Sequence, residues 1–186
     1  MPSDEILLEA EEKMIKTEEV VQREFAGVRT GKASPALIEN IQAEVYGSMM
    51  RIRELASITT PEPRMLVIQP WDISALQPIE KAIQKANLGL SPVIQGKLLR
   101  LAFPELSTER RQEFVKLIKK MSEDARVSIR HARREAMDLF KKHAHDSGIT
   151  EDATKQAEKD LQKLTDDYIG KLDGHVVSKE KEIMTV

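Results

Sequence analysis

The 186-residue chain has no cysteine, few aromatic residues and no long apolar run. The lack of cysteine excludes disulfides and thiolate metal sites, and it is typical of proteins in a reducing compartment. No apolar run approaches the ~20 residues that a membrane-spanning helix needs. The N-terminal run MPSDEILLEAEEK is acidic, whereas a signal or transit peptide would be basic. We therefore expect a soluble, cytoplasmic protein that makes no contact with membranes.

The sequence also lacks the motifs of catalysis. No H-E-x-x-H or paired-aspartate motif is present, and the four histidines lie in charged helical stretches, where a solvent-exposed role is expected. The run GVRTGKASP, from Gly27 to Pro35, superficially resembles a phosphate-binding loop. Its two glycines are one residue too close for that loop, Ala33 stands where a metal-binding hydroxyl is needed, and the run follows a helical pattern instead of a strand. The sequence predicts no enzyme, no cofactor and no metal site.

Helical periodicity covers both ends of the chain. Apolar residues recur every three or four positions over residues 3–28, from Ser107 or Thr108 to about His145, and from Thr150 to Ile183. At 1.5 Å per residue these helices would be roughly 38, 55 and 50 Å long. Because none can bury its apolar stripe alone, we expect a three-helix bundle.

The stretch between the first two helices reads as a small α+β module. Four short runs, IQAEVYG, MRIREL, SITT and RMLVIQP, resemble strands, and KLLRLAF resembles a last strand. A helix is expected over residues 76–86, with Ser74 and Gln77 as a capping box and Pro78 in its first turn. The fold class is therefore α+β, with a bundle over 1–30 and 105–186 and an inserted β/α/β domain over 31–104.

The chain crosses between these two domains twice. The crossings are RTGKASP and AFPELS, in which Gly31 has a free φ angle while Pro35 and Pro104 restrict the chain. Two short parallel linkers would form a hinge at Thr30, Gly31, Pro104 and Glu105. A rigid corner fits the same residue types, and the sequence leaves the two alternatives open.

A strongly basic face is predicted on the second long helix. At about 100° per residue, seven cations fall within an arc of about 100°, away from the apolar seam, and Glu123 is the single acid among them. These seven residues, here called the basic stripe, are Lys116, Lys119, Arg126, Arg130, Arg133, Arg134 and Lys141. An ordinary solvated face is one explanation, but such faces normally mix charge signs to avoid like-charge repulsion. Arginine pairs with phosphate through two hydrogen bonds, and the few aromatics argue against base stacking. We therefore favour a duplex or a folded RNA backbone over a single strand as the partner.

Several motifs together resemble those of bacterial ribosome recycling factors. They are FAGVRTGKASP, YGSMMRIRELASIT, IEKAIQKANLGLSP, LSTERRQEFVK and ARVSIRHARREA, in this order and spacing, and the resemblance covers essentially the whole chain. Two departures are Lys32, where the family often has Arg, and the run GSMMRI around Met49 and Met50, where the family often has a Pro-containing hairpin tip.

This resemblance implies both a fold and a role. The fold is an L-shaped molecule in which the small module is joined to the bundle by a hinge. The role is a monomeric protein that binds the A and P sites of the ribosome and separates its subunits with elongation factor G, which hydrolyses the GTP. Arg130, Arg133 and Arg134 would contact large-subunit ribosomal RNA, with Arg133 central, and we add Arg126 and Arg29 to this set. The alternative is a coiled-coil adaptor whose basic stripe binds an acidic helix.

Overall fold

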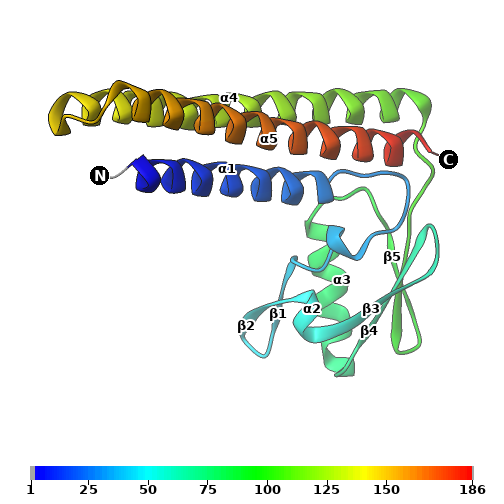
Figure 1. Ribbon diagram of the computed structural model, residues 1–186. Coiled ribbons are helices and arrows are strands. Elements are labelled where there is room, and N and C mark those ends of the chain that lie inside the picture. The colour runs from blue at the N-terminus through cyan, green and yellow to red at the C-terminus, as the bar shows by residue number, and fades with distance from the viewer. Residues whose placement is uncertain (1–2, 186) are drawn as a thin grey trace. The chain divides into compact units, whose positions relative to one another are not determined.

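The computed structural model describes residues 3–185 of the chain, and Figure 1 shows their path. Three long helices are present, namely α1 (Ser3–Ala26), α4 (Thr108–Ser147) and α5 (Glu151–Met184). Between α1 and α4 lie the strands β1 (Gln42–Val45), β2 (Ser48–Arg51), β3 (Ala56–Glu62), β4 (Met65–Pro70), β5 (Pro92–Gln95) and β6 (Leu98–Ala102). The same stretch contains the helices α2 (Ile52–Leu55) and α3 (Leu76–Lys85) and the 3-10 turns η1 (Pro35–Leu37) and η2 (Ile73–Ala75).

The chain divides into two compact units. One contains residues up to Phe25 together with Glu113–Glu182, and the other contains Ala26–Gln112 together with the residues from Ile183 onward. Long helices in a bundle and a small unit with a β-sheet confirm the predicted α+β fold class. The domain boundaries predicted at residues 30–31 and 104–105 stay a prediction.

The core of the helical unit consists of apolar side chains at the positions that the three- and four-residue spacing of the sequence predicts. On α1, Ala10, Met14, Val21 and Phe25 are buried at intervals of four and seven residues. Ile118 on α4 and Leu161 and Leu172 on α5 are fully buried. Figure 1 shows α4 running antiparallel to both α1 and α5. Each side chain of this kind contributes about 1.5–3 kcal/mol on burial, so the shared core stabilises helices that would be marginal alone.

Side-chain caps fix where two of the long helices begin. The backbone N–H of Arg110 donates to Ser107 Oγ at 3.2 Å, and that of Ala153 donates to Thr150 Oγ1 at 3.4 Å. These bonds satisfy amide groups that have no partner within the helix. Ser107 and Thr150 are therefore the capping residues of α4 and α5.

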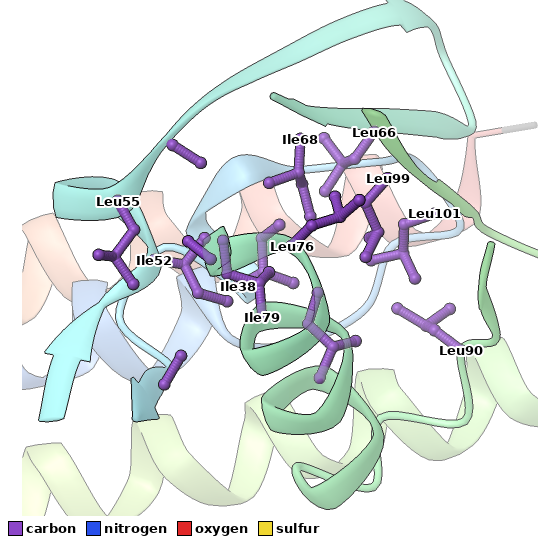
Figure 2. Packing of buried hydrophobic residues seen from close by; sticks show 14 of the residues in the cluster. Ile38, Ile52, Leu55, Leu66, Ile68, Leu76, Ile79, Leu90, Leu99 and Leu101 are labelled. Carbon is purple, nitrogen blue, oxygen red and sulfur yellow. The ribbon is translucent and has the colours of Figure 1, made fainter. Parts of the chain in front are cut away.

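The small unit packs α3 against one face of a four-stranded antiparallel sheet, whose strand order is β3-β4-β6-β5. A separate hairpin of β1 and β2 completes the unit. Alternation along β4 and β6 points Leu66, Ile68, Leu99 and Leu101 inward, where they meet Ile79 of α3 and are fully buried (Figure 2).

Two local predictions for the small unit were wrong, and one strand was not predicted. The run MRIREL is not one strand, because α2 begins at Ile52, where Glu54 Oε2 accepts a hydrogen bond from the Arg51 N–H at 3.2 Å. The residues around Pro92, for which the sequence analysis named no element, form β5. A proline is possible in this strand because β5 is an edge strand and a missing N–H costs little there. No capping box joins Ser74 and Gln77. Instead, Asp72 Oδ1 accepts from the Ser74 N–H at 3.0 Å.

Candidate nucleic-acid interface

The basic stripe lies along α4 within the helical unit. Its members differ in exposure: Arg130 and Arg134 are exposed, whereas Arg126 and Arg133 are half-buried. The helical angles explain this difference. The edge of the stripe nearest the apolar seam is formed by three residues that lie within about 20° of the direction of Arg126, namely Arg126 itself, Lys119 and Arg133. The stripe therefore has two sides with different surroundings.

The seam-facing side of the stripe contacts α5. Arg133 Nη1 donates to Gln162 Oε1 at 2.8 Å, and Lys119 Nζ lies 3.9 Å from Glu180 Oε1. Arg126 pairs with Asp173 through Nη2, and this hydrogen bond raises the pKa of the guanidinium. These three cations tie α4 to α5 in addition to carrying positive charge.

The outward side of the stripe consists of the four cations at about 40–80° from Arg126. They are all exposed, and they are Lys116, Arg130, Arg134 and Lys141. Among residues 3–185, Lys116, Arg134 and Lys141 form no hydrogen bond or ion pair with another side chain. Unpaired exposed cations that share one side of a rigid helix present a row of hydrogen-bond donors to an anionic surface.

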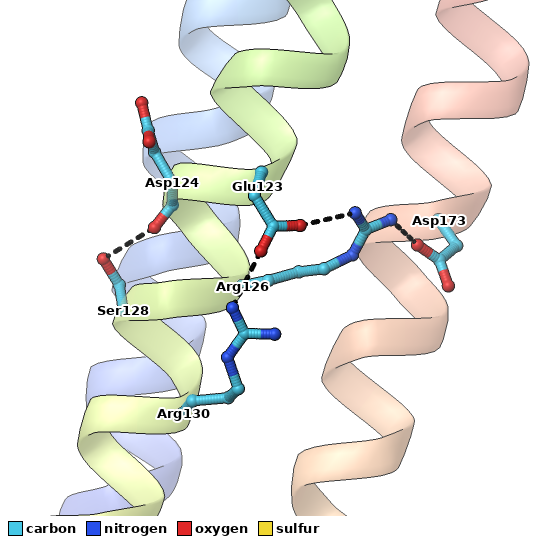
Figure 3. Close-up of polar contacts among 6 residues, drawn as sticks. All are labelled: Glu123, Asp124, Arg126, Ser128, Arg130 and Asp173. Atoms are coloured by element: carbon cyan, nitrogen blue, oxygen red, sulfur yellow. Dashed lines mark hydrogen bonds and ion pairs between the residues drawn. The ribbon is translucent and has the colours of Figure 1, made fainter.

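Glu123 interrupts this row (Figure 3). Its Oε1 accepts from Arg130 Nη2 at 2.8 Å, and its Oε2 accepts from Arg126 Nη1 at 3.2 Å. The bond from Arg130, and after it the bond from Arg126, lowers the pKa of the Glu123 carboxyl. Glu123 is therefore ionised at neutral pH and neutralises part of the stripe.

The exposure expected for Arg133 needs a correction. A helical wheel places Arg133 near the edge of the cationic arc and away from the apolar seam, which predicts an exposed side chain. Arg133 is instead half-buried and bonded to Gln162. The wheel describes one helix alone and takes no account of the long α5 side chains that reach toward it.

Arg29 lies in the other unit and carries unsatisfied donors. Its Nε and Nη2 are buried and have no hydrogen-bond partner among the described residues. Burial, together with repulsion from Arg110, lowers the pKa of Arg29. A guanidinium with buried, unpaired N–H groups costs free energy that an anionic ligand would recover.

Three α5 residues that hold the stripe were not predicted. Gln162, Asp173 and Glu180 are spaced by eleven and seven residues, which places them within about 20° of one another on the helix. The sequence could have revealed these residues through their position on one side of the same helix. Acidic or amide groups at this spacing, next to a basic helix, suggest pairs between the two helices.

The remaining chemistry of the surface is sparse. Within residues 3–185, no group of three or more His, Cys, Asp or Glu side chains is arranged to hold a metal ion. The described helices include none that is long and apolar enough to cross a membrane. The run GVRTGKASP follows helix α1, and within it the Lys32 N–H donates to Thr30 Oγ1 at 3.5 Å. The arrangement of strand, loop and helix that a phosphate loop requires is therefore not formed there.

Comparisons with known proteins agree along nearly the whole chain. A model of the family described as "Ribosome recycling factor" matches residues 21–184. The chain is 54% identical to the ribosome-recycling factor of Caldicellulosiruptor saccharolyticus over 177 residues, which cover 95% of this chain and 96% of that protein. It is 47% identical to that of Bacillus subtilis, covering 99% of this chain and 100% of the other.

Two solved structures are similar to the whole fold. A solution structure of a ribosome recycling factor matches with a TM-score of 0.84 and 45% identity, covering 100% of this chain and 99% of the other. A second match has a TM-score of 0.70 and 42% identity and covers 100% of both chains. This structure is described as models for the T. thermophilus ribosome recycling factor and the E. coli elongation factor G bound to the E. coli post-termination complex.

Proposed function

The chain belongs to the ribosome recycling factor family, and from this premise we propose that it disassembles the post-termination ribosome complex together with elongation factor G and GTP. Members of this family are translation factors and not enzymes, so hydrolysis of GTP falls to the elongation factor. The solved relative that accompanies elongation factor G on a post-termination complex supports this choice of partner. Because the proposed target is the ribosome, we expect the protein to lie in the cytoplasm and to act there as a monomer.

We propose that the basic stripe binds large-subunit ribosomal RNA in the region of the A and P sites. The observation that carries this role is the outward side of the stripe, where four exposed cations line one side of α4 and three of them, Lys116, Arg134 and Lys141, form no hydrogen bond or ion pair among the described residues. Arg134 would reach a phosphate directly, whereas Arg130 would do so on leaving Glu123 and Arg133 on leaving Gln162. Arg126 lies at the margin of this surface, because Asp173 and Glu123 already hold it.

Arg29 would supply a second point of contact with the RNA. Its buried, unpaired Nε and Nη2 atoms are donors that a phosphate oxygen can satisfy. A phosphate at this position would also offset the repulsion between Arg29 and Arg110. The RNA-binding set is therefore Arg133, Arg130, Arg134, Arg126 and Arg29.

We further propose that Thr30, Gly31, Pro104 and Glu105 form a hinge between a bundle domain (1–30 and 105–186) and an inserted domain (31–104). Gly31 adopts a φ of +82°, which favours glycine. The Ala33 N–H donates to the Pro63 carbonyl at 2.7 Å, and the Phe103 N–H donates to the Arg64 carbonyl at 2.8 Å. Both crossings are thus hydrogen-bonded to the β3–β4 turn on the side of the inserted domain. A change in the direction of the chain would therefore occur next to these bonds, at the four proposed hinge residues.

Two assays test the proposed function. The first is co-sedimentation of the purified protein with ribosomes at increasing salt, in which RNA binding predicts an affinity that falls steeply with salt. The second is polysome breakdown, in which we expect activity only when elongation factor G and GTP are both present. Binding to a protein partner but not to ribosomes would support the coiled-coil adaptor and contradict our proposal.

A further inference from the structure

Glu123 stands where a phosphate of the RNA would be expected to bind. On α4 it lies at about 60° from Arg126, in the middle of the outward side of the stripe, and no other acidic residue of α4 falls between about 40° and 80°. Its two oxygens take one N–H group from Arg130 and one from Arg126. Glu123 thus accepts hydrogen bonds from two guanidinium groups, as the oxygens of a bound phosphate would.

The pair is too exposed to be explained by stability. The side chains of Arg130 and Glu123 are 50% and 55% exposed. Ion pairs with this exposure contribute little to folding, since solvent screens the attraction and ordering two long side chains costs entropy. Holding α4 to α5 does not require Glu123 either, because Arg126 reaches Asp173 with its other nitrogen.

We propose that Glu123 is a built-in competitor that limits how tightly the basic stripe binds RNA. In the free protein it occupies Arg130 and part of Arg126, so a phosphate must displace it and then tolerate its charge nearby. Weaker binding suits a factor that must leave the ribosome after each round. This inference rests on the proposed RNA-binding role of the stripe.

The test is the affinity of the full-length chain for purified bacterial large ribosomal subunits. In Glu123→Gln the side chain keeps its size but loses its charge, and we expect binding about fivefold tighter at low salt, from relief of a like-charge repulsion of about 1 kcal/mol. Arg130 then contributes fully to counterion release, so the salt dependence should steepen by as much as about one unit. Asp124→Asn is the matched control: it removes the same charge one residue away, on the side of α4 that faces the groove with α1.

A double-mutant cycle separates competition from a general charge effect. In an Arg130→Ala background, Glu123→Gln should strengthen binding much less than it does in the wild-type chain. An equal gain in both backgrounds, an equal gain from Asp124→Asn, or weaker binding by Glu123→Gln would each overturn the proposal. If Arg130→Ala and Arg133→Ala weaken binding while Glu123→Gln changes nothing, the stripe binds RNA and the competitor role alone fails. If none of these substitutions alters affinity, the RNA-binding role itself fails.

Discussion

Arg133 of α4 donates a hydrogen bond from Nη1 to Gln162 Oε1 of α5, across a distance of 2.8 Å. The residue that the resemblance places at the centre of the RNA contact is thus also part of the joint between two helices. Loss of Arg133 therefore removes a structural bond and a cation together. Gln162 offers a way to separate them, because its replacement removes the bond but keeps the charge.

The first prediction concerns the stability of this joint. Arg133→Ala and Gln162→Ala should each destabilise the protein by about 1 kcal/mol, because each removes the same half-exposed hydrogen bond. The melting temperature should fall by about 2–4 °C in either variant, and the double variant should lose less than the two losses added together. Thermal unfolding followed by circular dichroism measures all three. Full additivity would show that the two side chains do not stabilise each other.

A second prediction concerns the buried hydroxyl of Ser122. This side chain is 1% exposed, and its Oγ has no hydrogen-bond partner among the described residues. Ser122→Ala removes an unsatisfied polar atom from the core and leaves almost no cavity, so we expect a gain of about 1 kcal/mol in unfolding free energy. Ser128→Ala is the control on the same helix, since its Oγ donates to the Asp124 carbonyl in an exposed position. A lower melting temperature for Ser122→Ala would contradict the assignment of Ser122 as unsatisfied.

The ion pair between α1 and α4 leads to a third prediction, on pH. Lys13 Nζ lies 2.8 Å from Glu135 Oε2. This contact lowers the pKa of Glu135 below its ordinary value of 4.5 and raises the pKa of Lys13 above its ordinary value of 10.5. The Glu135 carboxylate contributes to the free energy of unfolding above pH 4.5, and this contribution is lost as the pH falls through the pKa of the folded state. The Lys13 ammonium contributes below pH 10.5, and its contribution is lost as the pH rises through its own pKa in the folded state.

Glu135→Gln should accordingly lower the melting temperature at about pH 7, and the difference from the unmodified chain should vanish at about pH 3. Asp138→Asn removes the same negative charge from an exposed position of α4 and provides the control. The comparison requires melting curves for the three proteins across this range. A difference that persists undiminished at about pH 3 would mean that packing, and not the ion pair, is responsible.

The fourth prediction concerns the proposed hinge. Gly31→Ala introduces a side chain at φ +82°, which costs about 1–2 kcal/mol for L-residues and should restrict the crossing. Because the chain has no cysteine, spin labels attached to introduced cysteines at exposed Lys163 and Ser91 can report the distance between the units. We expect a broad distance distribution that Gly31→Ala narrows or shifts. Gly47→Ala, at φ +75° in the turn between β1 and β2, introduces similar strain and should leave the distribution unchanged. A single narrow distance in the unmodified chain would show a rigid corner.

The sequence predicts the long helices well, because burial along them depends on spacing that the sequence displays directly. Ala10, Met14 and Phe25 fall where a 3.6-residue period requires. The short elements α2 and β5 were missed because four-residue segments are determined by their neighbours. Ile52 is fully buried in the core of the small unit, and β5 depends on pairing with β6.

The candidate site shows the same division. Helical angles correctly gather seven cations and Glu123 on one side of α4, since that grouping depends on a single helix. They do not show which cations are already engaged. The contacts of Arg133, Arg126 and Lys119 come from side chains of α5, 29 to 61 residues away along the chain. Only the packing of two helices brings them together.

The measurement that tests the central claim most directly is the affinity of Arg133→Ala and Gln162→Ala for ribosomes at two salt concentrations. Both variants lose the same interhelical bond, but only Arg133→Ala loses a cation. We predict that Arg133→Ala binds much more weakly, with a salt slope reduced by about one unit, and fails in recycling with elongation factor G and GTP. Arg130→Ala should show a milder loss and Arg126→Ala a smaller one again, whereas Gln162→Ala should bind like the unmodified chain. If Arg133→Ala retains full affinity and slope, or if Gln162→Ala loses as much, the basic stripe does not bind ribosomal RNA in the way proposed.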